Sequence, residues 1–271
     1  FTTGNQMMLE GKRVVHVELE PTHIDRYVNV DVGVVGDASV VAEAMIEMLS
    51  AAEHTPSGFR TSDLENKLRE FDPTAAFDDK SYDGAVDPRT LTRRLDRGLP
   101  QQRQVVIDGG RFMFDALTLS VPQPQDFFTS HAFGSIALGT ATAIGVAVAR
   151  PDRPTVFCVG DGGLMMGGLA ELSTAVHLGL DLIVVVYNDH CYGAEHIQLV
   201  AKGLDPSASL HDWPDLCAVA KSMGFNTAKI DSLEDIDDAM QVVENRTLGV
   251  PVLIEASIDP DVVSTIYQQL G

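Results

Sequence analysis

The sequence predicts an α/β protein whose main part is a doubly wound parallel sheet with helices on both faces. From residue 87 onward, short apolar segments that suit strands alternate with helical segments, and this alternation is typical of a parallel sheet. Residues 182–187, with the sequence LIVVVY, are continuously apolar and β-branched, which indicates a strand covered on both faces. Residues 155–159, a Gly-rich turn, a helical segment and residues 182–187 follow one another as in a right-handed crossover.

Residues 1–52 predict a small and incomplete α/β unit. Residues 12–20 and 32–35 indicate strands, residues 21–26 indicate a helical turn, and Asp37 is placed to cap a helix that runs to about residue 52. Two short strands and one long helix cannot enclose a core. We therefore expect this unit to be the end of a larger domain whose remainder is missing.

Residues 53–86 predict a linker between domains. They are rich in Asp, Ser, Thr and Pro, and only residues 63–71 show a helical pattern. The predicted organisation is therefore a partial domain over residues 1–52, a linker, and a main domain over residues 87–271.

The elements of the main domain are predicted in order. Pro88 suits the first turn of a helix, and Gly179 is placed to end one. We expect strands at residues 104–107, 126–129, 155–159, 182–187, 227–230 and 252–256. We expect helices at residues 87–98, from the turn at 108–110 to about 120, at 135–149, 164–178, 214–223 and 233–244, and from Asp261.

The composition disfavours several classes of partner. The chain has 19 Lys and Arg against 39 Asp and Glu, a net charge of −20, so we expect neither nucleic acid nor an anionic membrane surface as a partner. No uninterrupted apolar stretch of about 18 residues predicts a membrane span. Cys158, Cys191 and Cys217 lack a metal-binding spacing, and their odd number argues against a disulfide framework, so we expect a cytoplasmic protein.

Two oxygen-bearing side chains follow neighbouring strands of the predicted crossover. Asp161 comes after the first strand and Asn188 after the second, and the carboxyl ends of parallel strands lie at one edge of a sheet. A carboxylate, a carboxamide and a backbone carbonyl from the following turn suit Mg²⁺. The amides of Gly162 and Gly163 open a helix, where an anion is favoured. The sequence therefore predicts a site for Mg²⁺ and a phosphorylated ligand.

Residues 160–162 (Gly-Asp-Gly), the following helix and strand, and Asn188 resemble the thiamine diphosphate (ThDP) binding motif of the acetolactate synthase and pyruvate decarboxylase superfamily. That motif ends in Asn-Asn and its second Asn is a metal ligand; here Tyr187 stands in the place of the first Asn. The resemblance implies that Asp161, Asn188 and the backbone carbonyl of His190 bind Mg²⁺.

Further segments resemble cofactor contacts of this superfamily. The turn at residues 108–110 stands where family members contact the diphosphate, although a plain strand-helix turn explains it equally well. In residues 132–136, the resemblance implies that the Gly134 carbonyl accepts from the 4′-amino group and that Ile136 wedges the cofactor into its bent form, unless Ile136 is a core residue. The implied cofactor-binding set is Asp108, Gly109, Gly110, Gly134, Ser135, Ile136, Gly160, Asp161, Gly162, Gly163, Asn188, His190, Tyr192 and Gly193.

The catalytic residues are not identified by the sequence. His131 and His190 are candidates for proton transfer near neutral pH, but a structural role explains each as well. By the resemblance, the Glu that activates ThDP lies on a pyrimidine-binding domain that this chain does not match, so we expect the isolated chain to be inactive. Residues 1–52 resemble the end of the central Rossmann-like domain, which holds FAD in some members only. Trp213 is predicted to pack or to anchor a lid.

The resemblance implies the C-terminal part of a ThDP- and Mg²⁺-dependent enzyme, acetolactate synthase-like, that decarboxylates a 2-oxo acid, ligates the product to a carbonyl acceptor, or does both. One alternative is a simple 2-oxo acid decarboxylase or aldehyde lyase. Others are a noncatalytic cofactor-binding module that needs a partner chain, and a doubly wound domain for another phosphorylated ligand. A homodimer or homotetramer is expected, in which the missing pyrimidine-binding domain or a partner chain completes the site.

Overall fold

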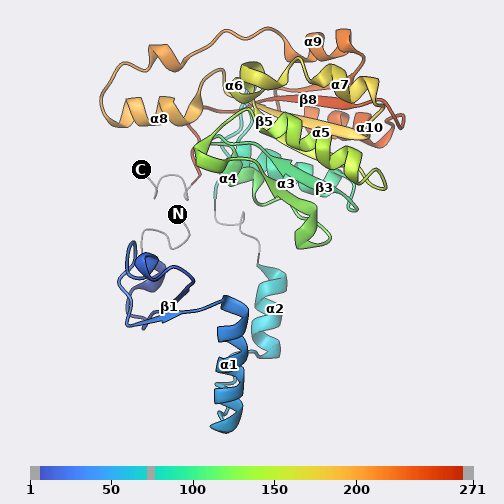
Figure 1. Cartoon of the computed structure of the whole chain (residues 1–271). Coiled ribbons are helices and arrows are strands. Elements are labelled where there is room, and N and C mark those ends of the chain that lie inside the picture. The colour runs from blue at the N-terminus through green and yellow to red at the C-terminus, as the bar shows by residue number, and fades with distance from the viewer. Residues whose placement is uncertain (1–6, 72–76, 265–271) are drawn as a thin grey trace. The chain divides into compact units, whose positions relative to one another are not determined.

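The computed structural model describes residues 7–71 and 77–264 (Figure 1). Contacts between residues divide the chain into two units, Phe1–Asp72 and Pro73–Gln269. Within the described ranges, every helix is too short or too polar to cross a bilayer.

The first unit contains two parallel strands and two helices, as the sequence predicts. Asp37 caps the first helix, since its carboxylate accepts from the amides of Ser39 at 2.9 Å and Val40 at 3.3 Å. Neither helix of this unit buries a residue. The assignment of residues 1–52 to a central domain stays a prediction. The elements are η1 (Met7–Leu9), β1 (Val15–Glu18), η2 (Pro21–His23), β2 (Val32–Val35), α1 (Ala38–Ala51) and α2 (Ser62–Glu70).

The second unit is built on a parallel sheet of six strands, in the order β4-β3-β5-β6-β8-β7 (Figure 1). This confirms the predicted fold class. Val86 is fully buried and pairs with Ile258, so residues 77–86 pack on this unit. The assignment of residues 53–86 to a linker stays a prediction. The strands are β3 (Gln104–Ile107), β4 (Phe127–Thr129), β5 (Thr155–Gly160), β6 (Leu182–Asn188), β7 (Asn226–Ile230) and β8 (Val252–Ser257).

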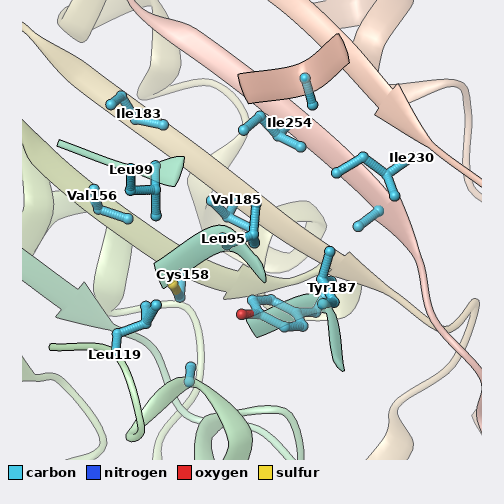
Figure 2. Packing of buried hydrophobic residues seen from close by; sticks show 14 of the residues in the cluster. Leu95, Leu99, Leu119, Val156, Cys158, Ile183, Val185, Tyr187, Ile230 and Ile254 are labelled. Carbon is cyan, nitrogen blue, oxygen red and sulfur yellow. The ribbon is translucent and has the colours of Figure 1, made fainter. Parts of the chain in front are cut away.

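Successive strand residues point to opposite sides of the sheet, and here both sides carry apolar residues. Helices therefore cover both faces. Val105 and Ile107 belong to one buried cluster and Val106 to the other. Figure 2 shows the first cluster, in which Leu95 of a helix and Leu99, the residue after that helix, pack on the sheet. The helices of this cluster are α3 (Pro88–Gly98), α4 (Met113–Ala116) and α10 (Asp235–Glu244). The helices of the opposite cluster are α5 (Gly139–Ala149), α7 (Leu172–His177) and α9 (Leu216–Met223).

The single helix predicted over residues 164–178 is wrong in detail. The structure has a short α6 (Asp161–Gly163), a π-helical turn η5 (Leu164–Gly168) and then α7. A Cβ at Gly168 would lie 2.1 Å from Thr140 Oγ1, so η5 packs against α5 at a distance that only glycine allows. Such π-helical turns are common beside functional sites.

Four further predictions differ from the structure. The helix predicted from the turn at 108–110 to about residue 120 is only the short α4. The helix predicted from residue 135 begins at Gly139, because Ala137 has a left-handed backbone (φ 71°). Residues 193–201 form a helix, α8 (Gly193–Ala201), that was not predicted. The last helix, predicted from Asp261, is absent over residues 261–264, and its remainder lies outside the described residues.

Substituting Leu95 with Ala should destabilise the second unit by about 2–5 kcal/mol, because Leu95 is fully buried between α3 and the sheet. Urea unfolding followed by circular dichroism measures the change. Leu248→Ala is the matched control, since Leu248 is 77% exposed and its loss should cost less than about 0.5 kcal/mol. Equal costs for the two variants would contradict the described packing.

Candidate functional site

The turns that follow β3, β5 and β6 meet at one edge of the sheet. Ile107 pairs with Cys158 and Gly160 pairs with Tyr187, so the three strands end side by side. The first two turns also approach the loop at residues 131–139. A Cβ at Gly109 would lie 2.7 Å from the Ser135 carbonyl, and the same residue lies close to His131 and Ile136. The structure thus gathers the predicted segments 108–110, 131–137, 160–163 and 188–193 at this edge.

Asp108 holds the loop before α5. Its buried carboxylate accepts from the amides of Ala137 at 2.8 Å and Gly139 at 3.1 Å and from Ser130 Oγ at 3.3 Å. Burial raises the pKa of Asp108, and these hydrogen bonds act against that rise. A Cβ at Gly163 would lie 2.7 Å from the same carboxylate. Asp108 therefore fixes the loop against the start of α6 with its side chain.

The loop before α5 is strained. Phe133 (φ 61°) and Ala137 (φ 71°) have left-handed backbones that side chains other than glycine disfavour, and Gly134 lies between them with φ 71°. Phe133 is wholly exposed, and Ser135 and Ile136 are half-buried. Strained backbone of this kind persists where surrounding contacts impose it, and it clusters at binding sites.

Asp161 is the first residue of α6 and is 2% exposed. Its Oδ2 accepts from the indole Nε1 of Trp213 at 2.8 Å. Burial raises the pKa of Asp161 to about 8, and the negative charge of Asp189 adds to the rise. A Cβ at Gly162 would lie 2.6 Å from the Tyr192 ring, so glycine lets the ring approach this helix start.

Asn188 is the last residue of β6, one position beyond the predicted strand end. It shares the face of Val184 and Val186, toward α9. Its Nδ2 donates to Glu255 Oε1 at 2.8 Å, and its Oδ1 accepts from the His190 amide at 3.0 Å. The Asn188 side chain thus binds to the end of β8 and to its own turn.

Asp189 is the acid that lies near Asp161. It is the first residue beyond β6, and its Oδ2 accepts from Arg111 Nε at 2.5 Å. Both side chains of this ion pair are 5% exposed. Arg111 also donates to the carbonyls of Val262 and Asp259, each at 2.9 Å. Asp189 is not among the site residues predicted from the sequence, although Asn188-Asp189 is itself a pair of oxygen-bearing residues.

The remaining candidates lie in the turn after β6 and in the loop before α5. His190 has a left-handed backbone (φ 56°), and its carbonyl accepts from the His211 amide at 2.9 Å. The Nδ1 atom of His131 is buried without a hydrogen-bond partner. A Cβ at Gly193 would lie 2.5 Å from Asp189 Oδ2 and 2.6 Å from Arg111 Cδ, so this glycine allows the ion pair to form.

Among the described His, Cys, Asp and Glu side chains, one group has ligand atoms spaced for a metal ion: Asp215, Cys217 and Glu255. Its acids already have structural partners. Asp215 caps α9 by accepting from the Ala218 amide, and Glu255 accepts from the Cys217 amide and from Asn188. Burial raises the pKa of the Cys217 thiol to about 12, so it stays protonated. This group ties α9 to β8 and to the end of β6.

A doubly wound parallel sheet with strained loops and buried acids at the carboxyl edge defines an α/β cofactor-binding domain. The chain belongs to the thiamine pyrophosphate enzyme family, whose C-terminal TPP binding domain matches residues 108–256. Thiamine pyrophosphate is another name for ThDP. The matched residues run from Asp108 to the end of β8 and so include every site turn described above.

Several characterised proteins are similar to the chain. The acetolactate synthase large subunit of Haemophilus influenzae is 26% identical over 267 residues, which are 94% of this chain and 46% of that protein. Acetolactate synthase isozyme 3 large subunit of Escherichia coli is 26% identical over 90% of this chain and 44% of that protein. Sulfoacetaldehyde acetyltransferase of Alcaligenes xylosoxydans xylosoxydans is 27% identical over 89% of this chain and 45% of that protein.

The fold also resembles a solved structure. The thiamine diphosphate-dependent 4-hydroxybenzoylformate decarboxylase of Rhodococcus jostii RHA1 matches with a TM-score of 0.70 and 20% identity, over 93% of this chain and 45% of that one. The chain therefore spans less than half the length of these relatives.

Substituting Arg111 with Gln should lower the free energy of unfolding by about 3 kcal/mol or more, because the buried Asp189 then loses its charge partner. Adding Asp189→Asn to the same chain removes the unpaired charge and should recover part of the loss. Urea unfolding of the two single variants and the double variant measures the coupling. Lys229→Gln is the control, since Lys229 and Asp231 form an exposed pair that should contribute less than about 1 kcal/mol. Additive effects at 111 and 189 would contradict the ion pair.

Proposed function

We propose that this chain is the diphosphate- and Mg²⁺-binding part of a ThDP-dependent enzyme of the acetolactate synthase type. The observation that carries the proposal is the pair of buried acids, Asp161 and Asp189, at the ends of adjacent strands. Arg111 pairs with Asp189, and burial together with the negative charge of Asp189 raises the pKa of Asp161. A divalent cation would stabilise the ionised form of Asp161. The two carboxylates of Asp161 and Asp189 offer the oxygen ligands that suit Mg²⁺.

The structure favours ligands one residue further along the chain than the resemblance implies. Asn188 uses its amide on Glu255 and on the His190 amide, whereas Asp189 carries its charge beside Asp161. We therefore propose Asp161 and Asp189 as the side-chain ligands of Mg²⁺. The carbonyl two residues after Asp189 belongs to Cys191, and it lies 3.8 Å from where a Cβ of Gly162 would be. We propose this carbonyl as the third ligand, since the His190 carbonyl accepts from His211.

The other site segments have roles that their positions support. The backbone amides at the start of α6 would bind the diphosphate, and the glycines at 162 and 163 let the chain approach it. The Gly134 carbonyl and the Ile136 side chain would hold the aminopyrimidine from the strained loop. When bound, ThDP supplies the nucleophile and the electron sink for breaking the bond next to a carbonyl. His131 lies against Gly109 at the same edge and is a candidate for moving a proton there.

The reaction of the whole protein is proposed from its relatives. Similarity to acetolactate synthases over most of this chain supports decarboxylation of a 2-oxo acid, ligation of the product to a carbonyl acceptor, or both. A simple decarboxylase is the second candidate, because the solved structural neighbour is one. We propose a cytoplasmic homodimer or homotetramer in which a further domain or partner chain supplies the activating Glu. The isolated chain should then be inactive.

Substituting Asp189 with Ala should weaken Mg²⁺-dependent binding of ThDP about 100-fold or more, beyond what loss of an outer partner typically costs. Asn188→Ala should affect binding less, and should mainly lower stability because Glu255 loses a buried partner. Isothermal titration of ThDP with and without Mg²⁺, paired with urea unfolding, separates the two effects. Asp237→Ala on the first turn of α10 is the control. Wild-type chain that binds no ThDP in the presence of Mg²⁺ would contradict the proposal.

The metal-free chain should lose stability as the pH rises from about 4 to about 8. The folded chain keeps a proton on Asp161, whose pKa is raised to about 8, while the unfolded chain has lost it, since a free Asp has a pKa of about 3.9. Asp161→Asn should make the free energy of unfolding fall less steeply with pH, by at most ~1.4 kcal/mol per pH unit. Urea unfolding in the presence of a chelator measures it. The same slope in both proteins would show that Asp161 titrates normally.

A further inference from the structure

Three aromatic side chains form a group beside the acid at the start of α6. The ring centroids of Tyr192 and His211 lie 4.4 Å apart at 73°, and those of His211 and Trp213 lie 4.4 Å apart at 22°. Tyr192 and Trp213 are 6.3 Å apart at 66°. The chain contains one tryptophan, and it is a member of this group. His211 lies in the middle and stacks directly on the indole.

Backbone hydrogen bonds hold the aromatic group in place. The Tyr192 amide donates to the Ser209 carbonyl at 2.9 Å, and the His211 amide donates to the His190 carbonyl at 2.9 Å. Between them, Cys191 and Leu210 form an antiparallel bridge. The segment that carries His211 and Trp213 is therefore fixed to the turn after β6, which also carries Asp189.

The indole reaches the carboxylate from this fixed segment. Trp213 Nε1 donates to Asp161 Oδ2 at 2.8 Å, and an indole N–H has no acceptor function. When Asp161 is ionised, as a cation ligand is, this bond is charge-assisted and therefore stronger than an ordinary side-chain hydrogen bond. The hydrogen bond occupies Oδ2 of Asp161 and fixes the plane of the carboxylate. This bond leaves the other oxygen, Oδ1, as the candidate ligand atom.

We propose that Trp213 is a positioning residue for Asp161: its indole N–H binds Oδ2 and so turns Oδ1 toward the divalent cation. This inference rests on the proposed function of the site. Outer partners of metal ligands typically contribute 10- to 100-fold to metal affinity, because they fix the ligand before the metal arrives. Stacking on His211 keeps the indole in the plane that this hydrogen bond needs. If Trp213 only packed against its neighbours, its indole N–H would not be required. A variant that keeps the ring but lacks the N–H therefore tests the positioning role.

The first test does not involve a metal. The ¹⁵N-labelled 271-residue chain should give one indole N–H resonance, because it has one tryptophan. In the metal-free chain this proton should exchange slowly with solvent, and Asp161→Ala should increase its exchange rate at least about tenfold. Asp212→Ala is the matched control, since Asp212 is the exposed acid next to Trp213 and should leave the rate unchanged. Equal exchange in wild type and Asp161→Ala would overturn the proposal.

The second test measures Mn²⁺ in place of Mg²⁺, by electron paramagnetic resonance of the free ion. Trp213→Phe keeps an aromatic ring but removes the N–H, and it should weaken Mn²⁺ binding about tenfold. His211→Phe keeps the stacked ring and should change the affinity less than about twofold. Circular dichroism spectra and thermal unfolding confirm that each variant is folded. Unchanged Mn²⁺ affinity in Trp213→Phe, or an equal loss in His211→Phe, would overturn the positioning role.

The two tests separate this inference from the proposed function. If the wild-type chain bound no Mn²⁺ with or without ThDP, the proposed metal site would fail, and with it the positioning of Asp161 for a cation. The exchange measurement would still show whether the indole holds Asp161. If Mn²⁺ bound to the wild type and Trp213→Phe equally, the metal site would stand and the role of Trp213 would fail.

Discussion

Two buried carboxylates at the ends of adjacent parallel strands are the constraint on which the site depends. Parallel pairing of β5 with β6 brings the turns that carry Asp161 and Asp189 together, and burial removes the water that would screen their charges. Arg111 forms an ion pair with Asp189 and so compensates the charge of one of the two acids. Without a cation the raised pKa keeps a proton on Asp161, and a bound cation would stabilise the ionised form of this acid.

The surrounding residues make this arrangement possible. Arg111 connects Asp189 to the chain after β8, and Glu255 connects Asn188 to α9. Asp108 holds the strained loop before α5. Each of these side chains is buried and uses its polar atoms within the fold, so the open edge is left to the start of α6 and to the turn after β6. Rigid support of this kind is what a precise metal and phosphate site requires.

Much of the fold could be predicted from the sequence, because its signals are local. The apolar segment of β6, the Asp-Pro start of α3 and the cap of α1 each specify one element through neighbouring residues. The metal ligands stay a prediction, because the choice between Asn188 and Asp189 depends on where a strand ends. β6 continues through Asn188, so alternation turns this side chain toward α9 and leaves Asp189 at the edge. The bond between Trp213 and Asp161 joins residues far apart in the sequence, and no local pattern indicates it.

One divalent cation is proposed to bind between Asp161 and Asp189. Anomalous scattering from a crystal grown with Mn²⁺ and ThDP tests it most directly, because the signal locates the ion without reference to sequence patterns. A single peak is expected within about 2.5 Å of one oxygen from each of these two carboxylates. A peak bound by the Asn188 side chain with Asp189 still paired to Arg111, or the absence of any peak beside Asp161, would contradict it.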